Sequence, residues 1–105
     1  KEISREEQMA TYIALVNFTD QGIRDIKASP GRVEAAKKLL NDLGGEMGQI
    51  FLTMGSHDAV FLMDLPDDAA AARFALTLGS FGNVRTNTLK AIPEDEYVEI
   101  IASLP

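Results

Sequence analysis

The chain has 105 residues, of which 46% are hydrophobic and 25% charged, so it is long enough for one globular domain with one core. It contains no cysteine and a single histidine, which excludes disulfides and thiolate metal sites and leaves no recognisable ligand spacing, so we expect no metal or cofactor. The formal net charge of -6 disfavours nucleic acid and anionic membrane surfaces as partners.

Residues 1–8 are charged, show no hydrophobic period and lack the apolar core of a signal peptide. We interpret them as a flexible N-terminal extension and residues 9–105 as the single domain. No stretch of the sequence reaches the ~18 to 20 apolar residues of a membrane span. Because no export signal is visible, a cytoplasmic location is expected.

The first half of the domain predicts a strand, a short turn and a helix. Residues 11–18 alternate as a strand, and Thr19 supplies capping chemistry for a short helical turn. Ser29 and Pro30 predict a helix start, with serine at the N-cap and proline at the first helical position. The helix carries one apolar stripe and ends at Gly44. The stripe consists of Val33, Ala36, Leu40 and Leu43.

The second half predicts two strands, a helix, a strand and a last helix. Strands at 47–54 and 59–65 are separated by so short a link that they form an antiparallel hairpin. Pro66 and the two aspartates after it begin a helix with a stripe of Ala71, Phe74, Ala75 and Leu78. A strand at 83–92 follows. Pro93 then opens a terminal helix, whose apolar stripe is Tyr97, Ile100, Ile101 and Leu104.

This order is the βαββαβ pattern of the ferredoxin-like fold, of the α+β class, with an added C-terminal helix. Right-handed crossovers place both main helices on one face of the antiparallel sheet and the first and third strands at its centre.

The two central strands are apolar on both faces. Residues 12–18 place Ile13 and Leu15 opposite the face of Tyr12, and residues 59–63 contain no polar side chain. A strand with one face in water alternates apolar and polar residues, so the second face needs a cover. We expect a second copy of the chain to pair through the sheet as a homodimer. The alternative is that the terminal helix folds back over its own sheet.

Three segments resemble the GYD domain family: residues 10–24, 53–59 and 79–86. The likeness extends over nearly the whole chain from Met9. It implies a dimeric α/β barrel built from two sheets, and it implies no particular activity. The chain departs from the family pattern in one place, because His57 stands where the family usually has a tyrosine, between the retained Gly55 and Asp58.

Two constellations are candidate sites. His57 and Asp58 sit together at the predicted hairpin, where an imidazole beside a carboxylate is suited to acid–base catalysis. The alternative is a surface histidine with Asp58 accepting backbone or arginine hydrogen bonds. Arg24 and Arg85 are expected at one end of the sheet. There they either bind a carboxylate ligand or pair with Asp20 or Asp58.

Polar side chains in the otherwise apolar sheet complete the candidate ligand-binding set, because a small-molecule pocket needs a few inward polar groups. They are Asn17, Thr53, Thr86 and Thr88.

Three functions follow from these features. The leading hypothesis is a homodimeric domain that binds a small apolar or carboxylate-bearing molecule, between the helix layer and the sheet or at the barrel mouth. The alternative is a cofactor-free monooxygenase or isomerase that uses His57 as acid or base. A purely structural interaction protein is the third possibility.

Overall fold

The computed structural model describes residues 9–105, so the predicted extension at 1–8 lies outside the described residues. Along the chain the elements are β1 (Ala10–Phe18), α2 (Asp20–Arg24), the 3-10 turn η1 (Ile26–Ala28), α3 (Ser29–Asp42), β2 (Glu46–Leu52), β3 (Ala59–Leu65), α4 (Asp68–Ser80), β4 (Val84–Ala91) and α5 (Glu94–Ala102). Among these residues no helix combines the length and the apolar character needed to cross a membrane.

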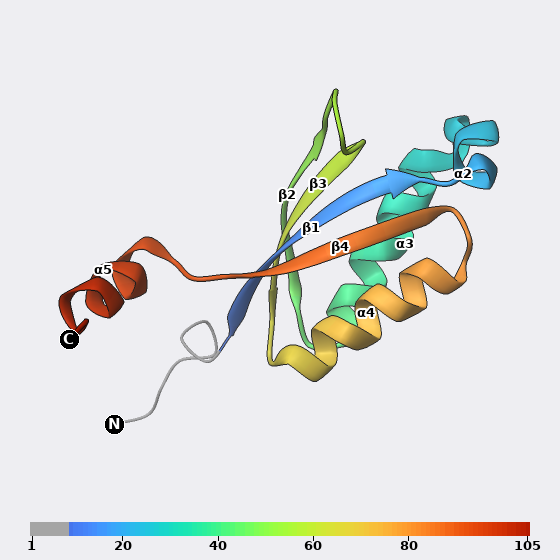
Figure 1. Cartoon of the computed structure of the whole chain (residues 1–105). Helices are drawn as coiled ribbons and strands as arrows, with labels where there is room; N and C mark the ends of the chain where they lie inside the picture. The colour runs from blue at the N-terminus through green and yellow to red at the C-terminus, as the bar shows by residue number, and fades with distance from the viewer. Residues whose placement is uncertain (1–8) are drawn as a thin grey trace.

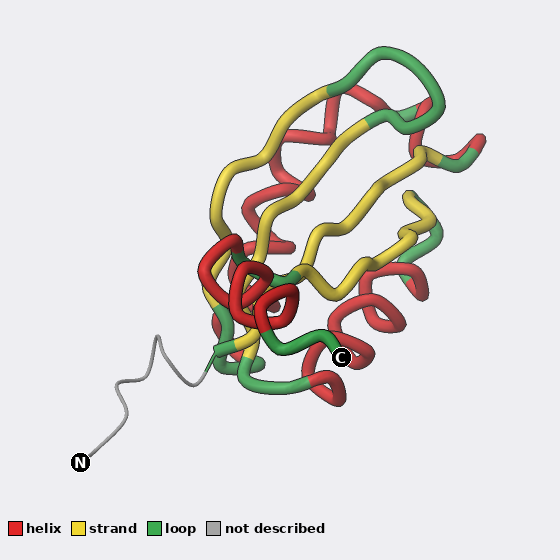
Figure 2. Tube along the Cα trace, turned by 60° about the vertical axis from the view of Figure 1, so that its left-hand side comes forward, coloured by secondary structure: helices red, strands yellow, loops and turns green. Residues whose placement is uncertain are grey.

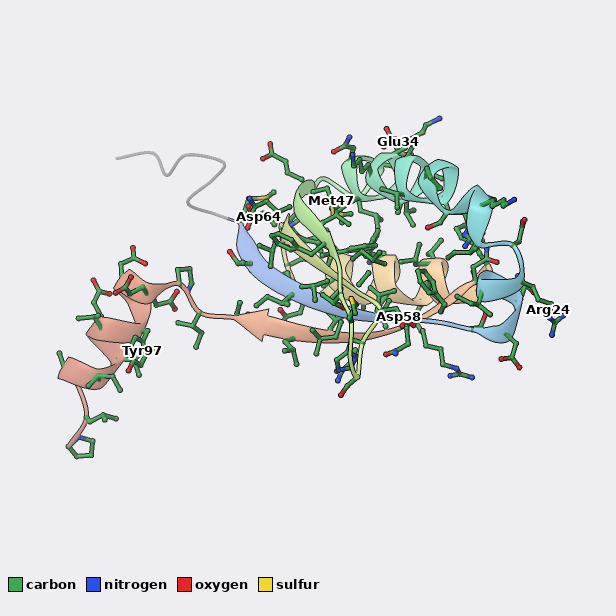
Figure 3. The ribbon with its side chains drawn as sticks, turned by 90° about the horizontal axis from the view of Figure 1, so that it is seen from above. Arg24, Glu34, Met47, Asp58, Asp64 and Tyr97 are labelled. Atoms are coloured by element: carbon green, nitrogen blue, oxygen red, sulfur yellow. The ribbon has the colours of Figure 1, made fainter. Side chains whose placement is uncertain are left out.

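The four strands form one antiparallel sheet in the order β2-β3-β1-β4. β1 and β3 are therefore central, and α3 and α4 lie on the same side of the sheet (Figures 1 and 3). This arrangement confirms the predicted ferredoxin-like fold. Figure 2 shows the loop between β2 and β3 at the end of the sheet opposite α5.

The core lies between the sheet and the two helices. Alternate residues of β1 and β3 face the helices, and the predicted apolar stripes of α3 and α4 pack against them. Leu40 and Leu65 are fully buried, and Phe74 is 1% exposed. The stripes were predicted correctly because a 3.6-residue period fixes one helix face regardless of what lies against it.

The opposite face of the sheet carries no helix within residues 9–105 (Figure 3). Register places Ile13 opposite Leu62, and Leu15 opposite Val60, on this face. All four side chains are only partly buried. We call the surface formed by Ile13, Leu15, Val60 and Leu62 the open sheet face. It is the apolar surface predicted from the central strands.

The terminal helix differs from one of the two expected arrangements. α5 projects beyond the end of the sheet (Figure 1), and none of its residues is buried. The alternative that this helix folds back over its own sheet is therefore wrong in this structure. Pro93 has an extended backbone and is the N-cap of α5. The chain therefore leaves β4 and starts α5 without turning back over the sheet.

Two local predictions need correction. Ser29 is the first residue of α3 rather than its N-cap, because η1 runs directly into the helix and Ala28 takes the N-cap position. β2 ends at Leu52 instead of residue 54, and Met54 is 99% exposed in the hairpin loop. The strand ends there because the Thr53 N–H donates to the Asp58 carbonyl at 2.9 Å and closes the loop, in which Gly55 has a positive φ of 136°.

Candidate functional site

The predicted site residues at the hairpin form a small hydrogen-bonded cluster. His57 Nδ1 lies 2.9 Å from Asn17 Oδ1, and Asn17 Nδ2 donates to the Ser56 carbonyl at 3.0 Å. Thr53 Oγ1 donates to the His57 carbonyl at 2.5 Å. Three of the predicted residues are thus brought together, and their bonds hold the β2–β3 loop against the end of β1.

The carboxylate and the N–H of Asp58 both form hydrogen bonds with the backbone of β1. Its carboxylate accepts the Phe18 N–H at 2.9 Å, and its own N–H donates to the Val16 carbonyl at 2.8 Å. This matches the structural alternative for Asp58, and it leaves no hydrogen bond between Asp58 and the His57 ring among the described residues.

The two predicted arginines do meet at one end of the sheet. Arg24 on α2 and Arg85 on β4 both line an open polar groove, together with Asn17 and Asp20. Both arginines are exposed. The expected ion pairs with Asp20 or Asp58 are absent from residues 9–105, where the ion pairs are Lys37–Glu34 and Lys90–Asp68. Asp58 is instead engaged by the β1 backbone.

Thr86 is separated from this group. It lies opposite Val16 in the β1–β4 register, on the helix side of the sheet, whereas Arg85 lies opposite Asn17 on the other side. The predicted ligand-binding set therefore divides between two faces, because adjacent residues of a strand point in opposite directions.

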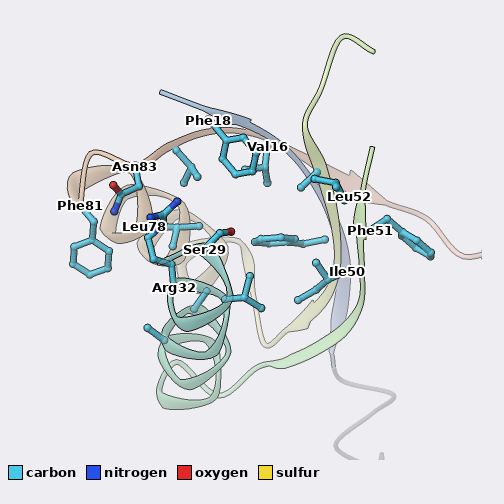
Figure 4. Close-up of a pocket in the computed structure, with 16 residues that line it drawn as sticks. Val16, Phe18, Ser29, Arg32, Ile50, Phe51, Leu52, Leu78, Phe81 and Asn83 are labelled. Atoms are coloured by element: carbon cyan, nitrogen blue, oxygen red, sulfur yellow. The ribbon is translucent and has the colours of Figure 1, made fainter. Parts of the chain in front are cut away.

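A separate apolar cleft opens between the helix layer and the sheet, with a volume of about 240 Å³ (Figure 4). We call this pocket the cleft. The sheet contributes mainly its helix-side residues near the hairpin end, with Phe51 of the edge strand β2 added, and the start of α3 and the end of α4 close the other walls. Its lining residues are Val16, Phe18, Ser29, Arg32, Val33, Ala35, Ala36, Ile50, Phe51, Leu52, Ala59, Phe61, Leu78, Phe81, Asn83 and Val84.

Within residues 9–105, three lining residues are polar or charged: Ser29, Arg32 and Asn83. In Figure 4, Arg32, Asn83 and Phe81 lie at one end of the cleft, and Leu52, Ile50 and Phe51 lie at the other. The cleft thus has a polar end and an apolar end. This is the usual construction of a small-molecule site, in which a few polar groups orient an otherwise apolar ligand.

Arg32 is the residue that sequence reasoning missed. Its Nη1 donates to the Asp25 carbonyl at 2.8 Å and its Nη2 to the Gly22 carbonyl at 3.1 Å. A signal was present in the sequence, because Ser29, Arg32, Val33 and Ala36 fall at i, i+3, i+4 and i+7 on one helix face. The predicted stripe included only the apolar residues of this helix, so no role was predicted for Arg32.

A third polar cluster lies at the start of α4. The Tyr12 hydroxyl donates to Asp68 Oδ1 at 2.5 Å, and Lys90 Nζ lies 3.0 Å from the same oxygen. Burial, followed by the nearby Asp68 carboxylate, raises the pKa of Tyr12 to about 12. The phenol and Lys90 lower the pKa of Asp68. A phenol held in its neutral form is no base at neutral pH, so this cluster is suited to holding α4 against the sheet.

Comparison with solved structures places the fold. The feast or famine regulatory protein of M. tuberculosis, solved with L-methionine, superposes with a TM-score of 0.64 at 15% identity over 89% of this chain. The structure of MtbAldR superposes with a TM-score of 0.58 at 11% identity over 90% of this chain. The chain spans 58% and 60% of those two chains, respectively. At these identities the likeness shows a shared fold.

Comparison by sequence gives the family. A curated protein of Thermus thermophilus is 36% identical over 91 residues, which are 86% of this chain and 96% of that protein. It is described as a glutamine synthetase and cystathionine beta-lyase binding protein. The model of the GYD domain matches residues 12–101. The chain therefore belongs to the GYD domain family.

Proposed function

We propose that this chain is a small binding protein that forms a homodimer through its open sheet face and holds a small molecule in the cleft. The observation that carries the proposal is the cleft itself, an apolar cavity with its polar groups gathered at one end. The description of the Thermus relative as a binding protein supports a binding role. The geometry gives no comparable support to an acid–base role for His57, whose ring is partly exposed and bonded to Asn17.

The homodimer is supported by the open sheet face. Burying an apolar face is worth about 25 cal/mol for each Å² removed from water, and no helix of residues 9–105 supplies that burial. A two-fold pairing of identical faces hides the same residues on both copies at once.

Binding in the cleft is tested by thermal unfolding against a panel of small aromatic and aliphatic acids and alcohols. A ligand that binds only the folded chain raises its melting temperature. Val33→Trp, which fills the cleft from α3, is expected to abolish the rise. Leu76→Trp, on the exposed face of α4, is the matched control and retains it. A flat response of the unmodified chain across the panel contradicts the proposal.

A second candidate function is binding to a metabolic enzyme, and the Thermus relative favours it. α5 offers an exposed surface for such a contact, with acidic residues in its first turn and apolar side chains along its length. Calorimetric titration of the full chain into glutamine synthetase and into cystathionine β-lyase tests this function. Saturable binding to either enzyme supports it, and the absence of heat change with both contradicts it.

A further inference from the structure

The charged group of the cleft suggests which class of ligand the cleft takes, an inference that rests on the function proposed above. Of the described residues that line the cavity, Arg32 is the one that is charged, and the others are apolar apart from Ser29 and Asn83. The chain as a whole carries 16 acidic against 10 basic residues. A lone cation beside an apolar cavity in so acidic a protein calls for a physical explanation.

The Arg32 guanidinium is positioned without being neutralised. Its two hydrogen bonds go to the backbone carbonyls of Gly22 and Asp25, at the end of α2. Neither of the ion pairs within residues 9–105 involves Arg32. A guanidinium has five N–H donors and no acceptor, so two bonds to neutral carbonyls leave donors and a full positive charge available.

The position of these carbonyls orients the side chain. Gly22 is buried, and Thr19 caps the helix in which it lies. Gly22 also packs so closely against Asn83 that the α2 backbone is held at a fixed place over the start of β4. Arg32 is thereby restrained at the same end of the cleft as Asn83 (Figure 4), and preorganised donors lose less entropy when they bind a ligand.

We propose that Arg32 binds the carboxylate of a small monocarboxylic acid whose hydrocarbon part occupies the apolar end of the cleft. Arginine presents its N–H groups in a planar fork that matches a carboxylate, and a carboxylate supplies the missing negative charge. The volume of about 240 Å³ lies at or below the small end of ligand pockets, which excludes a nucleotide-sized cofactor and favours a short aliphatic or aromatic acid.

The test compares an acid with its neutral counterpart on the full chain. Octanoate and 1-octanol have the same eight-carbon skeleton and differ at C1, which is a carboxylate in one and carries a hydroxyl in the other. Calorimetric titration of both compounds therefore measures what the carboxylate contributes to binding. We expect the unmodified chain to bind octanoate at least about tenfold more tightly than octanol. Arg32→Gln is expected to remove that preference while octanol still binds. Arg73→Gln, at an exposed position of α4 outside the cleft lining, is the control and keeps the preference.

Arg32 also hydrogen-bonds to the backbone at the end of α2, so Arg32→Gln could lose binding because α2 is displaced. A second variant separates the two causes. Arg32→Lys keeps the charge and loses the fork, and it is expected to retain only part of the preference, with circular dichroism verifying the fold. Equal affinity of the unmodified chain for octanoate and octanol overturns the role of Arg32 and leaves the cleft as an apolar site. No binding of either compound overturns both this inference and the proposed cleft function.

Discussion

At the scale of single residues, Gly22 packs against the backbone of Asn83 with no room for a side chain. A Cβ added to Gly22 would lie 2.0 Å from the Asn83 carbonyl oxygen, which is backbone and has little freedom to move. The same Asn83 oxygen accepts the Thr19 N–H at 3.0 Å. The sequence offered no sign that Gly22 holds α2 against the start of β4, because the contact joins segments that lie far apart along the chain.

Gly22→Ala is therefore expected to destabilise the chain by about 1–3 kcal/mol, since α2 must move to relieve the overlap. Gly31→Ala is the matched control. It lies in α3 with nothing near its Cβ position, and it should stabilise the chain by about 0.5–1 kcal/mol through helix propensity. Chemical denaturation of both variants gives the two values. Equal effects of the two substitutions would contradict the packing role of Gly22.

The Tyr12 phenol gives the chain a defined response to high pH. Its folded pKa of about 12 exceeds the ordinary value of 10.0. The folded state therefore favours the neutral phenol, a contribution present in full below pH 10 and lost as the pH rises through 12. Tyr12→Phe should flatten the stability profile between pH 10 and 12. Tyr97→Phe, at an exposed position on α5, should keep the slope. Urea unfolding at several pH values measures both, and an unchanged slope in Tyr12→Phe would refute the assignment.

At the scale of elements, α5 is a helix that does not pack against the core of the domain. The large apolar side chains of this segment are at least 41% exposed, and no residue of the helix is buried. They are Tyr97, Val98, Ile100, Ile101 and Leu104. The apolar period was visible in the sequence. The period specifies one apolar face of the helix, but it does not specify what that face packs against.

Deletion of residues 93–105 is accordingly expected to leave the sheet, α3 and α4 intact, with an essentially unchanged melting temperature. Circular dichroism should lose only the signal of one short helix. If α5 makes the contact with an enzyme partner, the same deletion abolishes that binding while small acids still bind the cleft. A large drop in melting temperature would show instead that α5 is packed in the protein in solution.

At the scale of the whole molecule, the proposed homodimer depends on the open sheet face. Leu62 of β3 lies on the open sheet face, opposite Ile13 of β1. Leu62→Lys places a charge within the proposed interface, where it has no partner, so we expect a monomer. Leu76→Lys, on the exposed face of α4, should remain dimeric. Sedimentation velocity distinguishes the two, and a monomeric unmodified chain would exclude the homodimer.

The sequence by itself determined the elements, their order and the two faces of the central strands. Periodicity and capping residues are local properties, and right-handed crossovers restrict the topology to few choices. Thr19 caps α2 as its residue type predicts, and the stripe through Ala36 and Leu40 is buried. His57 was singled out for its chemistry, whereas its hydrogen bond to Asn17 depends on how the hairpin meets β1.

Only the tertiary structure decided where charged and apolar groups meet. Arg32, Asn83 and Leu52 come from three distant segments and line one cleft, while Thr86 and Arg85 are neighbours in sequence and lie on opposite faces. A strand pattern gives the face of a residue, but which residues from other elements share that face follows from register and packing. The cleft exists because the start of α3, the end of α4 and the helix side of the sheet converge there, a property of the fold as a whole.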